Sequence, residues 1–293
     1  MDPIDHKSIA ELQSILNTIN FSHKVTSEVI EVIRNTYHFI GSAALEAYTG
    51  EIPNFKLCEE DPFTRFSILC FKLLELKQNY KANQIPESVF YDSVADLKLR
   101  QELYFEETKS IGLSIDDSIW LRHLFNMTLF KLNSLQFQLF EMKYLDQELL
   151  GEEYMIFSQN QKESLPPDSP VINVHIQDSA DLYPLEVKKS FRLALDFFNK
   201  HYPSYNFKAF ICYSWLLYSE NKKLLAKNSN ILKFAENFKI IGEVQDPEQA
   251  IECIYGKSNV EKDYYPMDTS LQRKAFPHFN QLGYACGIIE IKE

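Results

Sequence analysis

The chain has 293 residues, 45% of them apolar, and its 41 acidic residues outnumber 30 Lys and Arg, so the net charge is −11. Such a field repels a phosphate backbone, which argues against nucleic acid as a partner. No run approaches the roughly 18 apolar residues that would suggest a membrane span, so we expect no membrane partner.

The cysteines also limit what the protein can be. There are five of them, they are scattered, and no pair has the spacing of a zinc site. An odd, scattered set argues against a disulfide framework and for a reducing compartment. We therefore expect a cytoplasmic protein without a bound metal.

The N-terminal part has the pattern of helices. Apolar residues at helical spacing from Val25 predict one long helix that ends near Gly50. Asp61 and Ser114 each stand where an N-cap would open a further helix. We expect an all-helical N-terminal domain over residues 1–126.

The pattern changes after residue 126. Leu135, Phe137 and Leu139 alternate with glutamines, which predicts a strand, and residues 152–159 are a candidate second strand. A strand at 170–176, a helix from Pro184 and a strand at 207–217 follow, an order that favours a right-handed crossover between parallel strands. Further short strands and helices complete a mixed α/β sheet domain over residues 127–293, so the expected fold class is α+β.

Three residues of this sheet are candidates for catalysis. Cys212 and Ser214 share one face of their strand, and His175 lies in phase with Asn173 on the preceding one. If the two strands are neighbours, a His175–Cys212 pair could support a covalent acyl intermediate, and His175 alone could act as a general base for an amine. A packed histidine and an inert buried thiol are the alternatives.

Two predicted helix starts are candidate anion sites. Ser229 and Asn230 open one helix, and Gln272 and Arg273 fall in the first turn of another. Free N–H groups at a helix start bind phosphate without needing glycine. Plain N-capping and an ordinary salt bridge explain the same residues equally well.

A third group could line a substrate cleft. Trp120 and Arg122 fall near the junction of the two halves, and Trp215 lies on the strand of Cys212, on its other face. Ligand sites favour domain interfaces. Interdomain core for Trp120 and an ion pair for Arg122 are the alternatives.

Taken in order, the segments WLRHLF, LFKLNSLQFQ, NVHI, FICYSWLL, SNILKF and DTSLQR resemble bacterial acyltransferase domain-containing proteins. Members of that family pair a helical N-terminal domain with a C-terminal domain similar to GNAT-type N-acyltransferases. The resemblance implies transfer of an acyl group from acyl-coenzyme A, with an acetyl or longer chain, to a small-molecule acceptor of amine type. The protein could also form a homodimer, and the sequence does not decide this.

The chain departs from the wider GNAT superfamily at the coenzyme loop. Those enzymes hold pyrophosphate on a loop of pattern Gln/Arg-x-x-Gly-x-Gly/Ala, whereas the stretch we match to it here is SENKKLLAKNSN, without glycine. Either Ser229, Asn230, Gln272 and Arg273 hold the coenzyme, or it is not bound. The second hypothesis is therefore a non-catalytic GNAT-like protein that binds a small ligand or a partner.

Overall fold

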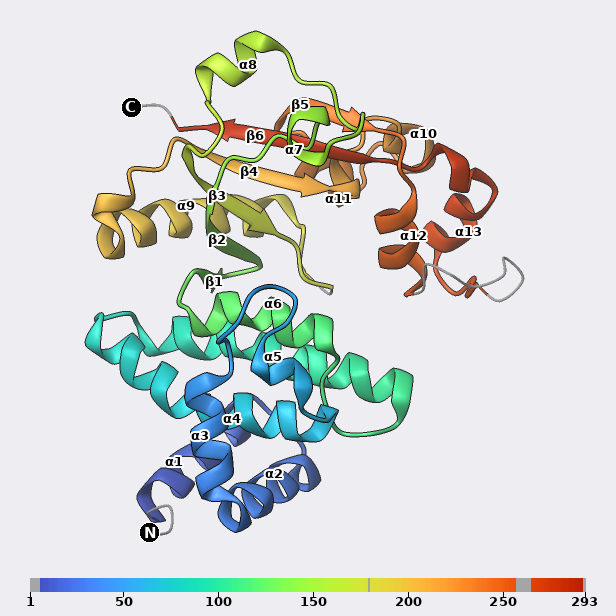
Figure 1. Ribbon diagram of the computed structural model, residues 1–293. Coiled ribbons are helices and arrows are strands. Elements are labelled where there is room, and N and C mark those ends of the chain that lie inside the picture. The colour runs from blue at the N-terminus through green and yellow to red at the C-terminus, as the bar shows by residue number, and fades with distance from the viewer. Residues whose placement is uncertain (1–5, 179, 257–264, 292–293) are drawn as a thin grey trace. The chain divides into compact units, whose positions relative to one another are not determined.

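The computed structural model describes residues 6–178, 180–256 and 265–291 (Figure 1). Contacts divide the chain into two compact units, Met1–Lys131 and Leu132–Glu293. The first contains the helices α1 (His6–Thr18), α2 (His23–Asn35), α3 (Tyr37–Glu46), α4 (Pro62–Ala82), α5 (Glu87–Thr108) and α6 (Ile115–Phe125), and the short 3₁₀ helix η1 (Lys56–Glu59). None of the described helices is long and apolar enough to cross a membrane.

The predicted caps open their helices. The Asp61 carboxylate accepts from the backbone N–H groups of Phe63 and Thr64 at the start of α4. The Ser114 hydroxyl accepts from the N–H of Asp117 at the start of α6. Both side chains satisfy donors that the first helical turn leaves unpaired.

The single long helix expected from Val25 is wrong, because the chain breaks it into α2 and α3. Thr36 has φ −126° and ψ 29°, outside the helical range. Its side chain and its N–H both bond to the carbonyl of Val32, which ends α2. Apolar residues keep the helical period across the break, so periodicity alone could not show it.

A six-stranded mixed sheet has the order β1–β2–β3–β4–β6–β5; β2 to β6 lie in the second unit, and β1 spans the boundary at Leu132. Its strands are β1 (Leu129–Leu132), β2 (Leu135–Glu141), β3 (Pro170–His175), β4 (Ala209–Ser214), β5 (Lys239–Val244) and β6 (Tyr284–Glu290). The helices of the second unit are α7 (Gln147–Leu150), α8 (Gln159–Ser164), α9 (Pro184–His201), α10 (Asn221–Leu224), α11 (Asn230–Ala235), α12 (Glu248–Tyr255) and α13 (Ser270–Ala275), with 3₁₀ turns η2 (Pro203–Tyr205), η3 (Trp215–Leu217) and η5 (Phe276–Gln281). The predicted α+β fold class is thus confirmed.

The strand–helix–strand unit predicted from the sequence is β3–α9–β4. β3 and β4 are parallel, and their registered pairs are Ile172↔Phe210 and Asn173↔Ile211. β2 and β6, which flank them, are both antiparallel to their neighbours. Toward their carboxyl ends β3 and β4 diverge (Figure 1). The backbone pairing of the sheet is therefore interrupted at the carboxyl ends of β3 and β4.

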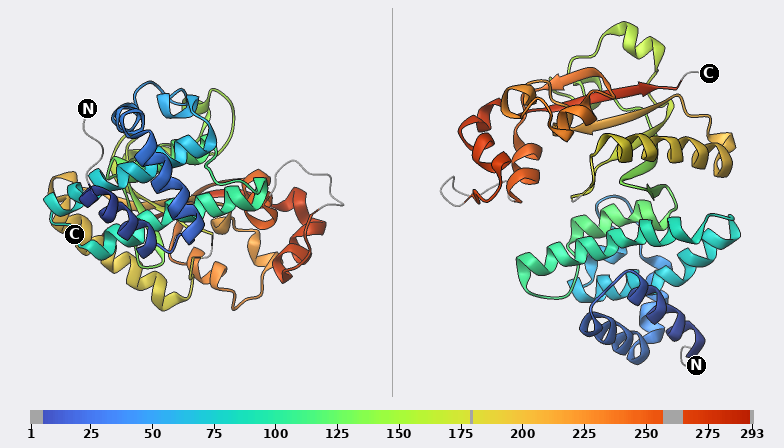
Figure 2. Two further views of the ribbon diagram at one scale, coloured as in Figure 1. Left: turned by 90° about the horizontal axis from the view of Figure 1, so that it is seen from below. Right: turned by 180° about the vertical axis from the view of Figure 1, so that it is seen from behind.

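The two faces of the sheet have different covers. On one face an aromatic cluster joins Phe137, Phe191 and Phe210, with ring centroids 5.2–5.8 Å apart. Phe191 belongs to α9, which lies across this face when the molecule is seen from behind (Figure 2, right). Side chains alternate along each strand, so residues one position away from Phe137 and Phe210 face the other side.

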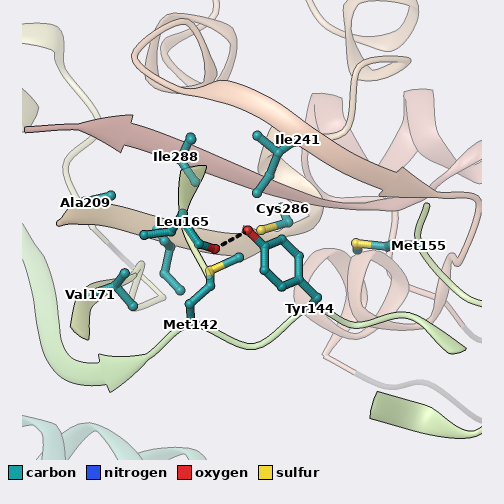
Figure 3. Packing of buried hydrophobic residues seen from close by; sticks show 10 residues of the cluster. Met142, Tyr144, Met155, Leu165, Val171, Ala209, Ile241, Cys286 and Ile288 are labelled. Carbon is teal, nitrogen blue, oxygen red and sulfur yellow. Dashed lines mark hydrogen bonds between the residues drawn. The ribbon is translucent and has the colours of Figure 1, made fainter. Parts of the chain in front are cut away.

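That other face is covered by the connection between β2 and β3. Met142, Tyr144, Met155 and Leu165 pack on Val171, Ile211, Ile241, Cys286 and Ile288 (Figure 3). The Tyr144 hydroxyl donates to the carbonyl of Leu165, 2.7 Å away, which closes the connection on itself. We call residues 142–165 the covering segment.

The strand expected at residues 152–159 is wrong, because this part of the covering segment runs irregularly over the sheet. Its aromatic side chains are what hold it in place. Tyr154 donates to Asp246 Oδ2 over 2.5 Å. The ring of Phe157 lies so close to Gly242 that a Cβ there would come within 2.5 Å of it. The apolar residues of this stretch thus serve packing and not strand pairing.

Candidate functional site

A polar cluster lies on the covered face where β2 and β3 pair. The register places Gln136 opposite His175 and Gln138 opposite Asn173, so all four side chains share one face. Gln136, Gln138 and Asn173 are only 2%, 4% and 7% exposed, and His175 is half-buried at the carboxyl end of β3. We call these four residues the β2–β3 polar cluster.

One hydrogen bond organises this cluster. His175 Nε2 lies 2.7 Å from Gln138 Oε1. An amide oxygen can only accept, so the ring donates from Nε2. In the neutral imidazole the lone pair is then on Nδ1. The Gln138 carboxamide therefore fixes the tautomer of the neutral His175 ring.

Asn173 adds a second feature. Among the residues that the structure describes, its Oδ1 is buried without a hydrogen-bond partner. More than nine in ten buried polar groups in native proteins are paired, and an unpaired one costs about 1–3 kcal/mol. The unpaired oxygen makes the surroundings of Asn173 a candidate place for a polar ligand.

The position of the cluster also fits a binding site. In open α/β sheets, ligands bind outside the carboxyl ends of parallel strands. His175 is the last residue of β3, at the end where β3 and β4 diverge (Figure 1). On β4, Tyr213 lies on the same face as Ile211, and its hydroxyl donates to the carbonyl of Lys143 in the covering segment. Burial raises the pKa of Tyr213 well above its ordinary value, so the phenol keeps its proton.

The strands of His175 and Cys212 are neighbours, as the dyad hypothesis required, but the two side chains are on opposite faces. His175 is in phase with Asn173, whose registered partner is Ile211, and Cys212 points the other way. Cys212 is fully buried, and burial followed by the nearby Cys286 raises the pKa of its thiol well above the ordinary value. A paired His175–Cys212 site does not form, and the thiol is not activated as a nucleophile.

Ser214 lies on the Cys212 face and ends β4. Its hydroxyl accepts from the N–H of Leu216, 3.2 Å away, and so caps η3. Trp215, the next residue, is buried, and its carbonyl accepts from the amide of Asn221 over 2.7 Å. A role of Ser214 in catalysis and of Trp215 in substrate binding stays a prediction.

The residues predicted to bind the coenzyme have partners within the protein. Ser229 caps α11 by accepting from the N–H of Ile231, and Asn230 is exposed beside it. Gln272 completes a capping box with Thr269 and donates to the carbonyl of Ile254. These contacts match the capping alternative, and coenzyme binding by the three residues stays a prediction.

Arg273 also bonds within its own segment. Its Nη1 donates to the carbonyls of Met267 and Asp268 over 2.6 and 2.9 Å. The guanidinium thus stabilises the turn before α13, although the side chain is exposed and has further donors. A phosphate contact by Arg273 stays a prediction as well.

Trp120 and Arg122 belong to the first unit. Trp120 Nε1 donates to Asp96 Oδ2 over 3.0 Å, and Asp96 is fully buried. The guanidinium of Arg100 lies 5.1 Å above the Trp120 ring and contacts Asp96 Oδ1 at 3.3 Å. Arg122 donates to the carbonyl of Ile119 in its own helix. The cleft proposed for Trp120, Arg122 and Trp215 stays a prediction.

The parallel unit offers a second place for a coenzyme loop besides residues 219–230, which follow β4. Within β3–α9–β4, residues 176–183 connect the first strand to the crossover helix. This stretch contains no glycine either, so the departure from the superfamily pattern applies to both places.

The start of α9 is also acidic. Asp181 Oδ1 accepts from the N–H of Tyr183 over 2.8 Å, and Pro184 at the first helical position has no N–H to offer. Glu186 adds a carboxylate in the first turn. Carboxylates at a helix start interact favourably with its dipole, so this end is already supplied with negative charge.

The sequence had concealed two members of the polar cluster. Gln136 and Gln138 alternate with apolar residues, which is the pattern of a strand with one solvent face. In the structure both faces of this sheet are covered, so the glutamines are buried polar residues. The observation that Asn173 and His175 share a phase was the available signal.

Among the described residues, no group of three or more His, Cys, Asp or Glu side chains could hold a metal ion.

The protein has a helical region followed by a mixed sheet, with a polar cluster at the end of the parallel strand pair. This arrangement is of the α+β class, with a GNAT-like second half. The profile of the GNAT-like C-terminal domain family matches residues 129–288. The chain belongs to this family, as its resemblance in sequence had predicted.

Solved structures share the whole fold. An acyltransferase in complex with decanoyl-CoA is similar with a TM-score of 0.74 at 17% identity, over 97% of this chain and 88% of that one. An acyltransferase in complex with decanoyl-CoA and teicoplanin has a TM-score of 0.71 at 14% sequence identity, over 97% of this chain and 88% of that one. An acyltransferase in complex with CoA and 10C-teicoplanin has a TM-score of 0.71 at 14% identity, over 96% of this chain and 88% of that one. A comparison with curated proteins finds no match.

Proposed function

We propose that the protein is an acyltransferase that moves an acyl group from acyl-coenzyme A to an amine-type small molecule. The observation that carries the proposal is the β2–β3 polar cluster at the diverging end of the parallel strands, in a GNAT-like domain. The similar solved structures hold decanoyl-CoA or CoA, which supports a thioester donor. A cytoplasmic location belongs to the proposal and is supported by five free cysteines.

In this proposal His175 is the general base. The imidazole takes a proton from the amine as the amine nitrogen attacks the thioester carbonyl, and the hydrogen bond to Gln138 orients the ring. The new C–N bond forms, the C–S bond breaks, and coenzyme A leaves as the thiolate, which recovers one proton. Backbone N–H groups or Ser214 would polarise the carbonyl.

The test separates binding from chemistry. Calorimetry with octanoyl-CoA measures donor binding, and release of the coenzyme thiol in the presence of primary amines measures turnover. We expect His175→Gln to bind the donor as the parent does and to lose about 10²–10⁴-fold in thiol release. Turnover unchanged in His175→Gln would remove this residue as the base.

A second candidate is a binding protein without catalysis. The acidic, glycine-free start of α9 favours it, because a diphosphate would meet the carboxylates of Asp181 and Glu186 there. This candidate predicts ligand binding without thiol release from any acyl-coenzyme A. Thiol release that depends on an added amine rules it out.

A further inference from the structure

One stretch of the covering segment leaves part of its backbone unpaired. Residues 153–157 lie outside the helices and strands. Within the part of the chain that the structure describes, their one backbone hydrogen bond runs from the N–H of Met155 to the carbonyl of Leu145, 3.0 Å away. The backbone N–H and C=O groups of Tyr154 and Ile156 have no partner among the described residues. These groups therefore bond only to water or to another molecule.

The side chains indicate that this stretch is locally extended. Met155 is 2% exposed and packs in the buried cluster of Figure 3, whereas the next side chain, Ile156, is 90% exposed. Phe157 turns inward again, where its ring contacts Gly242. In an extended chain with this alternation, the backbone groups of Met155 point to one side and those of Tyr154 and Ile156 point to the other. The stretch thus presents the free edge of a strand on the side away from its hydrogen bond.

A groove of about 620 Å³ lies along this stretch. Its lining includes residues 153–157, and it carries three carboxylates, those of Asp146, Glu148 and Glu153, against one ammonium group, that of Lys162. Lys162 contacts Asp146 and Glu148 at 2.7 and 2.9 Å, whereas Glu153 has no ion pair among the described residues. The groove thus places an excess of negative charge next to unpaired backbone groups, and a cationic chain with free backbone groups of its own is complementary to both.

We propose that this edge and groove bind an extended, basic segment of a partner polypeptide by strand addition. The segment pairs its backbone with Tyr154 and Ile156, on the side away from Leu145. Its lysine or arginine side chains contact the carboxylates of the groove, and an apolar side chain covers Ile156. A second copy of this chain fits less well, because two chains with a net charge of −11 repel each other. The inference is independent of the acyl transfer proposed above.

The experiment measures binding of a capped, fluorescently labelled hexapeptide of alternating lysine and valine to the full chain by fluorescence anisotropy. Ile156→Pro removes an N–H that the fold leaves unpaired and should weaken binding about tenfold. Ile156→Val keeps that N–H and a branched side chain and should bind as the parent does. Glu153→Gln should weaken binding about threefold, whereas Glu107→Gln, an equal charge change at an exposed position of α5, should leave it unchanged.

A second readout needs no variant and holds even if Ile156→Pro unfolds. Hydrogen exchange at residues 153–157 of the parent, followed by mass spectrometry, should slow when the peptide is bound. Absence of binding, or binding without slower exchange there, overturns the proposal. Equal effects of Glu153→Gln and Glu107→Gln would reduce the binding to net charge and overturn it as well. A peptide-free dimer that Ile156→Pro converts to a monomer in sedimentation would assign the edge to a second copy of the chain instead.

Discussion

The buried carboxylate of Asp96 gives the sharpest prediction about the helical unit. Asp96 accepts from Trp120 Nε1 on one oxygen and faces Arg100 Nε with the other, at 3.0 and 3.3 Å. Asp96→Asn keeps the shape, removes the charge and turns a donor toward one of these two groups. Each charge-assisted hydrogen bond contributes about 1.5–3 kcal/mol, and breaking a buried pair costs about 3–5 kcal/mol.

The expected cost is smaller than that upper range. Arg100 keeps its bond to Asp117 at 2.5 Å, so its charge is not left alone, and the asparagine retains one accepting oxygen. We expect about 3 kcal/mol of lost stability, a Tm lower by roughly 10 °C for a unit of this size. Thermal unfolding followed by circular dichroism measures it.

The matched control is Asp116→Asn. Asp116 lies in the first turn of α6 and is exposed, so the same chemical change there should stay within about 0.5 kcal/mol. If the two variants unfold at the same temperature, the Asp96–Trp120 contact does not hold the unit together. A stable Asp96→Asn variant with lost activity would instead support Trp120 as a cleft residue.

Three further predictions concern other parts of the chain. Burial lowers the pKa of His123 to about 4, below its unfolded value of 6.5, so its contribution to stability is present above pH 6.5 and lost toward pH 4. His123→Gln should therefore reduce the loss of unfolding free energy over this window by roughly 2 kcal/mol, measured as a smaller fall in Tm. Gly242→Ala should cost about 1–3 kcal/mol in urea unfolding, because its Cβ meets a ring, whereas Gly41→Ala in α3 should be neutral or stabilising. Iodoacetamide should label Cys253, which is exposed, and leave Cys212 unlabelled until denaturant is added; early labelling of Cys212 would contradict its burial.

Local rules predicted much of this fold correctly. N-caps at Asp61 and Ser114, and the strand–helix–strand order of the parallel unit, depend on near neighbours in the chain. The break at Thr36 was missed because the apolar period continues through it. The strand prediction for residues 152–159 was wrong because an aromatic segment that packs on top of a sheet has the same composition as a strand inside the sheet.

The candidate site was less predictable, because it depends on which faces of the strands come together. Sequence phase related His175 to Asn173 but could not show that Cys212 points to the opposite side. Nor could it show that Gln138 is buried and is the hydrogen-bond partner of His175. These facts follow from strand register and from burial of the strand faces, both of which are tertiary features.

The interruption between β3 and β4 separates the antiparallel pair β2–β3 from the antiparallel group β4–β6–β5, and the two groups meet along one seam. The seam has two registered residue pairs at its closed end and is braced on the α9 side by the rings of Phe137, Phe191 and Phe210. Widening at the open end would break no backbone pair inside either group. The two groups are therefore joined by two residue pairs and by aromatic packing, and the open end of the seam is left without backbone pairing.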